Sequence, residues 1–199
     1  MPGERYDGWQ IAHGLVMLDS PVISGWRGHT VQVLKRSRLL HRLGPGKISA
    51  TRRHAWPSRQ AAHDHFAAKS KFARWAPGVL ADYIACGTHR EPGNPGGEMA
   101  LSFRREVETR IYNTLPHHLG RVLQRHPLQC PVGFIAGTRS TEIRQGGVEG
   151  ARRLAGERFQ WIEGSHLYPM EKPQETAEAV LGLLQRLQAV QAGVGSQGG

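Results

Sequence analysis

The sequence lacks any long apolar run and almost lacks cysteine. No stretch of the 199 residues approaches the roughly 20 consecutive apolar residues that a membrane-spanning helix needs. The opening residues, MPGERYDGWQ, show neither the apolar core nor the small-residue cleavage site of a signal peptide. Cys86 and Cys130 alone are too few for a disulfide framework. We therefore predict a cytoplasmic protein with two free thiols and no membrane partner.

Acidic residues are also scarce, because 16 Asp and Glu stand against 26 Lys and Arg and leave a formal charge of +10. Such a balance would suit a nucleic-acid-binding protein. The densest basic stretch, residues 35–53, contains no aromatic residue on which a base could stack, and no known nucleic-acid-binding motif surrounds it. We interpret this stretch as a solvated basic face and keep nucleic-acid binding as an alternative that we do not favour.

Short apolar runs alternate with helical patterns along part of the chain. The runs cover residues 15–18, 132–136 and 159–162. Apolar residues recur at helical spacing over residues 148–155, after the second run, and over residues 174–187, after the third. Strands that alternate with helices in this order are typical of a parallel sheet covered by helices.

A long segment in the first half of the chain interrupts this alternation. A helix is predicted from Ser58 to about Trp75, with Ser58 as its N-cap, and a second from Gly78 to Ala85. We therefore expect a mostly helical insert that forms a lid over the carboxyl ends of the strands. The predicted division is a core of residues 14–43 and 119–187, a cap insert of residues 44–118, and a disordered tail of residues 188–199.

Candidate site residues follow the apolar runs, since ligands of open α/β sheets bind beyond the carboxyl ends of the strands. Asp19 follows the first run, Glu142 lies shortly after the second, and His166 comes after the third. The histidine stands in the segment Gly-Ser-His-Leu-Tyr-Pro-Met-Glu-Lys-Pro, just before an amphipathic helix. This segment resembles the last strand-to-helix connection of the α/β-hydrolases, which carries the histidine of their Ser-His-Asp/Glu triad.

The resemblance covers most of the chain, with the three runs similar to strands six to eight and the insert similar to the cap. It implies the C-terminal part of an α/β-hydrolase fold, a short parallel sheet flanked by helices, with His166 as the general base. Many family members place the triad acid after strand seven, where Ser140 stands here and cannot carry the charge. Asp19, at the end of strand six as in haloalkane dehalogenases, is our candidate for the orienting carboxylate, and Glu142 is the alternative.

The nucleophile of that family is missing from the sequence. No Gly-x-Ser-x-Gly elbow and no Asp or Cys counterpart occurs in it. The resemblance implies a parent activity of ester or acyl hydrolysis on a small-molecule substrate, but base and acid act only through a nucleophile. We therefore predict that this chain alone is inactive, as a truncated fragment of a longer hydrolase. A non-catalytic binding or interaction module that keeps the fold's second half is the alternative.

Two further expectations concern partners and cofactors. Without the preceding strands of the fold, the first strand would expose an apolar edge, which favours self-association or pairing with a chain that completes the fold. His63 and His65 are two residues apart on a predicted helix and point to different sides, so they make a poor metal pair. We expect neither a metal site nor a cofactor.

Overall fold

Two compact units make up the chain. The first unit comprises Met1–Gly28 and His117–Gly199, and the second comprises His29–Pro116. The residue range of the second unit is similar to that of the insert predicted at residues 44–118. The first boundary of the unit falls outside the described residues. The computed structural model describes residues 14–22, 45–90, 96–114, 122–123, 125–126, 128 and 130–195.

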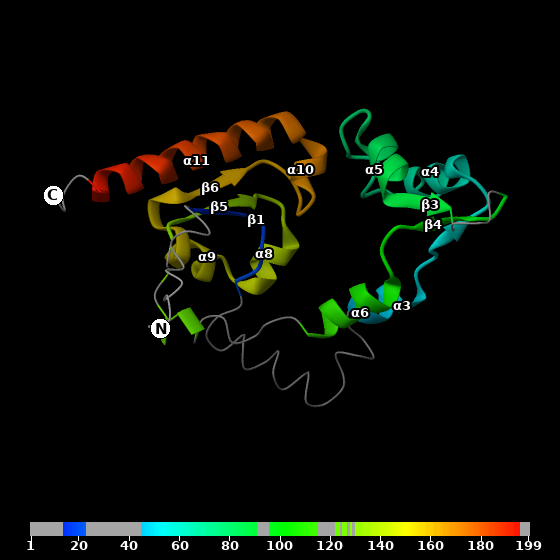
Figure 1. Ribbon diagram of the computed structural model, residues 1–199, viewed down its shortest axis with the longest axis horizontal. Coiled ribbons are helices and arrows are strands. Elements are labelled where there is room, and N and C mark those ends of the chain that lie inside the picture. The colour runs from blue at the N-terminus through cyan, green and yellow to red at the C-terminus, as the bar shows by residue number, and fades with distance from the viewer. Residues whose placement is uncertain are drawn as a thin grey trace, which may run out of the picture. The chain divides into compact units, whose positions relative to one another are not determined.

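The first unit is built around a parallel sheet with the strand order β1-β5-β6 (Figure 1). The sheet confirms the three predicted strands and their parallel arrangement. β5 lies in the middle and all its residues are buried. β1 is partly exposed, with 48% of Leu15 accessible, because among the described residues it pairs with β5 alone. The strands are β1 (Leu15–Leu18), β5 (Val132–Gly137) and β6 (Phe159–Ile162).

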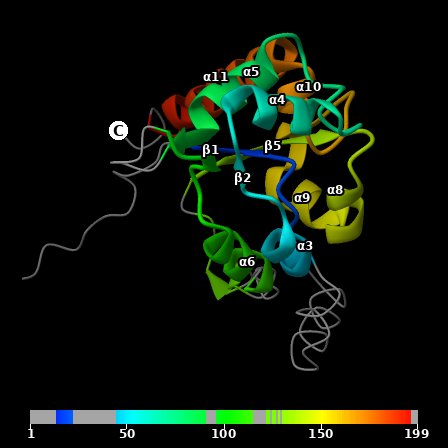
Figure 2. The same cartoon turned by 90° about the vertical axis from the view of Figure 1, so that its right-hand side faces the viewer.

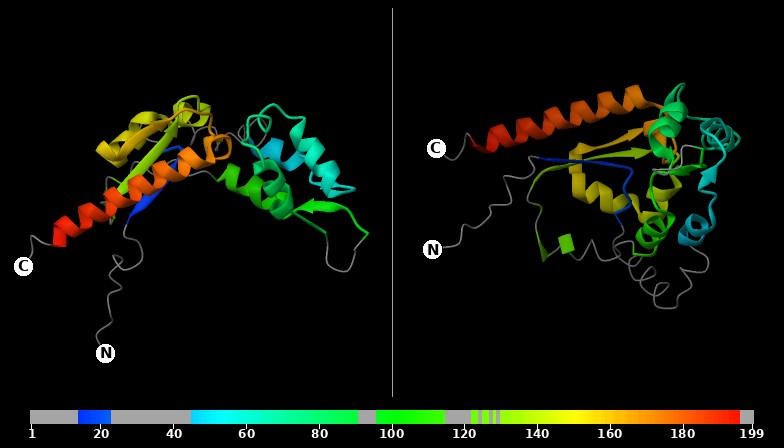
Figure 3. Two further views of the ribbon diagram at one scale, coloured as in Figure 1. Left: turned by 90° about the horizontal axis from the view of Figure 1, so that it is seen from above. Right: turned by 45° about the vertical axis from the view of Figure 1, so that its right-hand side comes forward.

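Helices cover both faces of this sheet. Figures 2 and 3 show α11 on one face and α8 with α9 on the other. Side chains of β5 alternate between these faces, so that Phe134 and Ala136 pack against α8 and α9 while Ile135 packs beneath α11. The helices of this unit are α8 (Thr141–Gly146), α9 (Val148–Ala155), α10 (Tyr168–Glu171) and α11 (Pro173–Gly195), with a 3-10 turn, η2, at Gly156–Arg158.

The last helix, α11, is longer than the sequence pattern predicts. The pattern ends at residue 187, whereas the helix continues to Gly195. The prediction of a disordered tail is therefore wrong for residues 188–195, and residues 196–199 lie outside the described part. No glycine or proline occurs between residues 183 and 192, so the helical backbone continues although the apolar spacing has ended. No helix in the described part of the chain is long and apolar enough to cross a membrane.

The second unit combines helices with a small antiparallel sheet in the order β2-β4-β3. Its core is an aromatic cluster built on Trp56 and Phe66, and α3 packs against α6. Ser49 of α3 donates to Glu108 Oε2 of α6, and Arg52, directly after α3, donates to the same oxygen at 2.7 Å. The elements are α3 (Pro45–Thr51), β2 (Ala55–Trp56), α4 (Arg59–Ala67), α5 (Val79–Gly87), β3 (Thr88–Arg90), β4 (Met99–Leu101) and α6 (Arg105–Asn113).

The helices of this unit match the predictions in position but not in length. Ser58 caps α4 as predicted, and its hydroxyl accepts from the Ala61 amide at 3.1 Å. The helix ends at Ala67 rather than near Trp75. The chain turns after Ala67 so that Trp75 packs back against Tyr83 of α5, with their ring centroids 5.5 Å apart. The apolar residues after Ala67 have helical spacing although the chain turns there, which explains why the predicted helix was too long. The three short strands of this unit were not predicted.

Candidate functional site

Asp19 ends the first strand at the carboxyl edge of the sheet. Its amide donates to the carbonyl of Ile135 at 2.8 Å, which continues the pairing of β1 with β5. Its backbone then enters the left-handed region, with φ of 46°. Few residues other than glycine adopt this region, and aspartate is among those that tolerate it best. The surrounding contacts must hold this turn, since such a backbone is retained only where neighbouring structure imposes it.

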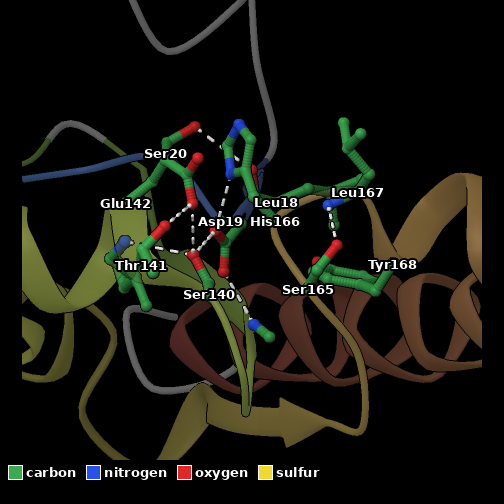
Figure 4. A network of polar contacts seen from close by, with 12 residues as sticks. Leu18, Asp19, Ser20, Ser140, Thr141, Glu142, Ser165, His166, Leu167 and Tyr168 are labelled. Atoms are coloured by element: carbon green, nitrogen blue, oxygen red, sulfur yellow. Dashed lines mark hydrogen bonds and ion pairs between the residues drawn. The ribbon is translucent and has the colours of Figure 1, made fainter. Parts of the chain in front are cut away.

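The Asp19 carboxylate is 1% exposed and accepts three hydrogen bonds (Figure 4). Oδ1 accepts from the Gly137 amide at 2.7 Å. Oδ2 accepts from the Ser140 hydroxyl at 2.5 Å, and the same oxygen lies 2.7 Å from Nδ1 of His166. These donors compensate for the burial of the carboxylate, which would otherwise be costly.

His166 lies in the loop between β6 and α10, with 39% of its side chain exposed. The hydrogen bond with Asp19 raises the pKa of the imidazole, burial opposes this effect, and the nearby charges of Glu142 and Asp19 raise the pKa further. Because Nδ1 is engaged by the carboxylate, the neutral ring carries its proton there and leaves Nε2 as the acceptor. The ring is therefore oriented to take up a proton at Nε2.

Glu142, the alternative acid, lies apart from this pair. Its Oε2 accepts from the Thr141 hydroxyl at 2.9 Å and lies 3.4 Å from the Ser140 hydroxyl. Its effect on His166 acts through space, by raising the pKa of the imidazole. The structure thus brings Asp19 into contact with His166, while Glu142 stays at the start of α8.

Ser140 has a second role that the sequence analysis missed. Besides donating to Asp19, its hydroxyl accepts from the Ile143 amide at 3.1 Å and so caps α8. The spacing between Ser140 and Ile143 signals an N-cap, but nothing in the sequence shows that the same hydroxyl holds a carboxylate from another strand.

The backbone at Gly137 lies close to the backbone of the loop that carries His166. A Cβ added at Gly137 would lie 2.5 Å from the carbonyl oxygen of Ser165, so only glycine fits there without movement. Tyr168 lies beneath the loop and donates its phenol to the carbonyl of Ile135 at 3.2 Å. Burial, and to a lesser extent the charge of Asp19, raises the pKa of this phenol. Gly137 and Tyr168 thus hold the loop that carries His166 against the end of β5.

The serines around the site are engaged elsewhere (Figure 4). Ser20 donates to the carbonyl of Leu18 at 3.4 Å, and Ser165 donates to Glu171 Oε1 at 2.6 Å. Ser140 is fully buried and donates to Asp19. None of these hydroxyls bonds to His166, so none of the serines drawn in Figure 4 is placed as its nucleophile.

Of the remaining candidates, His65 and Cys86 belong to the second unit, and Cys130 precedes β5. The ring of His65 packs against Trp56, with centroids 5.4 Å apart, and burial lowers the pKa of its imidazole, as do the charges of Lys69 and Arg53. In the part of the chain that the structure describes, no three His, Cys, Asp or Glu side chains could hold a metal ion together. Cys86 and Cys130 are free thiols. Residues 35–44 of the basic stretch lie outside the described residues.

Comparison with known proteins identifies the fold. No protein-family model and no curated protein matches this sequence. An esterase structure from M. tuberculosis matches with a TM-score of 0.57 at 19% identity, covering 88% of this chain and 55% of the esterase. A peroxisomal α/β-hydrolase from Saccharomyces cerevisiae matches with a TM-score of 0.57 at 12% identity, covering 92% of this chain and 48% of the yeast protein.

A third structure, E-2-(acetamidomethylene)succinate hydrolase, matches with a TM-score of 0.54 at 13% identity, covering 90% of this chain and 60% of that one. The chain therefore spans between about half and three fifths of the length of the solved structures that it matches. Its parallel sheet, with helices on both faces, corresponds to part of each of them. This chain has an α/β-hydrolase-like fold.

Proposed function

We propose that this chain supplies the general base and the orienting carboxylate of a serine-type α/β-hydrolase, with the nucleophile outside these 199 residues. The observation that carries the proposal is the contact of 2.7 Å between Asp19 Oδ2 and His166 Nδ1 at the carboxyl edge of the sheet. In a Ser-His-Asp triad the carboxylate holds the ring through Nδ1, and Nε2 takes the proton of the nucleophile. The parent reaction is hydrolysis of an ester or related acyl bond in a small-molecule substrate.

The electrostatics of the pair fit this role. Asp19 stabilises the imidazolium that forms when His166 accepts a proton, and the same interaction raises the pKa of the imidazole. Since only the neutral ring can act as a base, the rate of the completed enzyme should rise as pH increases through the raised pKa of His166.

The chain by itself should hydrolyse nothing by this mechanism. The sequence contains no Gly-x-Ser-x-Gly elbow. The hydroxyls of Ser140 and Ser165 donate to carboxylates and not to His166, so neither is activated as a nucleophile. A base without a nucleophile and an oxyanion hole gives no covalent catalysis.

Among the described residues β1 pairs with β5 alone, and we propose that the rest of the fold pairs at the other edge of β1. The amides of Leu15 and Asp19 donate towards β5. Because successive amides of a strand point to opposite sides, those of Val16 and Leu18 point to the other edge. The side chains of Leu15 and Leu18 are 48% and 36% accessible, and a further parallel strand at this edge would place its own side chains beside them. We propose that this strand belongs to the half that carries the nucleophile, on the same or a second chain.

A fluorophosphonate probe tests the proposal, because it labels only an activated serine. The 199-residue chain should remain unlabelled and should not hydrolyse p-nitrophenyl esters. Sequencing the DNA upstream of the Met1 codon tests whether the remainder is encoded in frame. A chain extended by such a segment, with a Gly-x-Ser-x-Gly motif, should become labelled at that serine and lose hydrolysis in a His166→Ala variant. Labelling of the short chain, or activity of the extended chain without His166, would contradict the proposal.

A further inference from the structure

We propose that Glu171 is a positioning residue for His166 that acts through Ser165, an inference that rests on the proposed role of His166 as the base. Glu171 ends α10, and its carboxylate holds the residue immediately before His166. We call this pair, Glu171 and Ser165, the clamp.

The loop that carries His166 has no regular structure of its own. β6 ends at Ile162 and α10 begins at Tyr168, so neither a strand ladder nor a helix fixes the intervening backbone. The imidazole is 39% exposed, which means that packing alone holds it only in part. Its contact with Asp19 depends therefore on hydrogen bonds made by the loop.

The clamp supplies these hydrogen bonds on both sides of His166. The amide of Ser165 donates to Glu171 Oε2 at 3.0 Å, and its hydroxyl donates to Glu171 Oε1 at 2.6 Å. The same hydroxyl accepts from the Leu167 amide at 3.1 Å, so it bridges across the histidine (Figure 4). The carbonyl of Ser165 accepts from the Tyr168 amide at 3.1 Å. Every polar group of Ser165 is thereby engaged, and bonds to a charged acceptor are the stronger kind.

The chain is shaped to let this carboxylate approach the loop. A Cβ added at Gly164 would lie 2.5 Å from the Cβ of Tyr168 and 3.2 Å from Glu171 Oε2. Any side chain at Gly164 would therefore displace the turn against which the clamp closes. The absence of a side chain at Gly164 therefore leaves room for the carboxylate of Glu171 to reach Ser165.

The clamp acts through geometry, because the groups found to raise the pKa of His166 are Asp19 and Glu142. Removing the Glu171 carboxylate also removes a negative charge beside the loop, which by itself lowers the pKa of an imidazole, so the neutral substitution Ser165→Ala carries the test. If the clamp holds the loop, its removal weakens the bond between Nδ1 and Asp19 and lowers the pKa of the imidazole towards its ordinary value of 6.5.

NMR titration of His166 in the full chain tests this inference without requiring any catalytic activity. Glu171→Ala and Ser165→Ala should each lower the pKa of His166 by about half a unit or more, a fraction of the one to two units that a hydrogen bond to a charged group represents. Glu171→Gln, which keeps one acceptor oxygen, should lower it less. Ser165→Ala removes no charge, so a shift in this variant can only come from the loop.

Glu175→Ala is the matched control, since Glu175 is an exposed carboxylate that pairs with Lys172 at 3.1 Å and does not contact the loop. It should leave the pKa of His166 unchanged. A Glu171→Ala or Ser165→Ala variant that lowers thermal stability without moving that pKa would show that the clamp is merely structural and would overturn the inference. If Glu171→Ala does not fold, Glu171→Gln and Ser165→Ala decide in the same way.

The outcome is distinguishable from that of the proposed function. If the clamp variants shift the pKa of His166 and the extended chain proves inactive, the positioning holds and the hydrolase role fails. If the extended chain is active and the clamp variants leave the pKa of His166 unchanged, the hydrolase role holds and the positioning role of Glu171 fails.

Discussion

Asp19 and His166 are 147 residues apart in the sequence, and their side chains meet at 2.7 Å. The parallel sheet explains this contact, because β1 and β6 both pair with β5 and their carboxyl ends lie on the same edge. The left-handed turn at Asp19 and the loop after β6 then lead the two side chains towards each other. The pair is thus a product of the topology rather than of any local motif.

Ser140 should contribute more to the free energy of unfolding than an ordinary helix cap does. Ser140→Ala removes both the cap of α8 and a donor to the buried Asp19, so we expect it to lower the free energy of unfolding of the first unit by about 2 kcal/mol or more. Urea unfolding measures this change. Ser58→Ala is the matched control, since Ser58 also caps a helix with a bond of 3.1 Å but holds no carboxylate. It should cost about 1 kcal/mol and leave the pKa of His166 unchanged. Equal costs for the two variants would contradict the role of Ser140 in holding Asp19.

Gly137 should tolerate no side chain. Gly137→Ala places a methyl group 2.5 Å from the carbonyl oxygen of Ser165, so the histidine loop must move, and we expect a loss of about 2 kcal/mol in unfolding free energy. Gly182→Ala provides the contrast in the same unit, because its Cβ would meet nothing within 4 Å and glycine is unfavourable inside a helix. That variant should be neutral or stabilise the unit by up to about 1 kcal/mol. A stable Gly137→Ala variant with unaltered His166 signals would show that the close approach is unimportant.

The contribution of the Asp19 and His166 pair to stability should depend on pH. The pKa of His166 is raised in the folded chain, so the folded state binds more protons than the unfolded state between the ordinary value of 6.5 and the raised value. The stabilisation is therefore fully present below pH 6.5 and is lost as pH rises through the raised pKa. The unfolding free energy of the natural chain should fall, relative to that of Asp19→Asn, across this window. Urea unfolding of both chains at several pH values measures the difference, and a difference that stays constant contradicts the pairing.

Glu142 should modulate His166 without orienting it. Glu142→Gln removes a charge that raises the pKa of the imidazole but leaves the bond to Asp19 in place. We therefore expect a smaller fall in the pKa of His166 than in Asp19→Asn, measured by the same NMR titration. A larger fall in the Glu142 variant would make Glu142 the orienting acid.

Much of the sheet could be predicted from the sequence, and the physical reason is burial. β5 is buried on both faces, so its apolar run is continuous and its ends are marked by Pro131 and Gly137. The sequence did not predict correctly which residues of α11 pack on the sheet. Leu181 belongs to the apolar pattern yet is 59% exposed, whereas Leu183 is buried over Gly133, where a Cβ would come within 3.2 Å of its methyl groups. This fit depends on two distant residues, and spacing along one helix cannot reveal it.

The site was predictable to a similar extent. Asp19 and His166 could be found because both follow strands, and the family resemblance identified the histidine. The roles of Ser140 and Ser165 could not, since each hydroxyl joins a carboxylate to a backbone amide in a geometry that only the folded chain defines. The antiparallel strands of the second unit were missed because each is two or three residues long and shows no alternating pattern.

The central claim, that Asp19 orients and charges His166, is tested most directly by NMR titration of His166 in the natural chain and in Asp19→Asn. Asparagine tolerates the left-handed backbone of this position but carries no charge. The account predicts a pKa above 6.5 in the natural chain and a fall in Asp19→Asn larger than in any other carboxylate variant. It predicts no change in Glu163→Gln, which removes an exposed partner of Arg139 and Lys172. A pKa of His166 at or below 6.5 in the natural chain, or one that Asp19→Asn leaves in place, would contradict it.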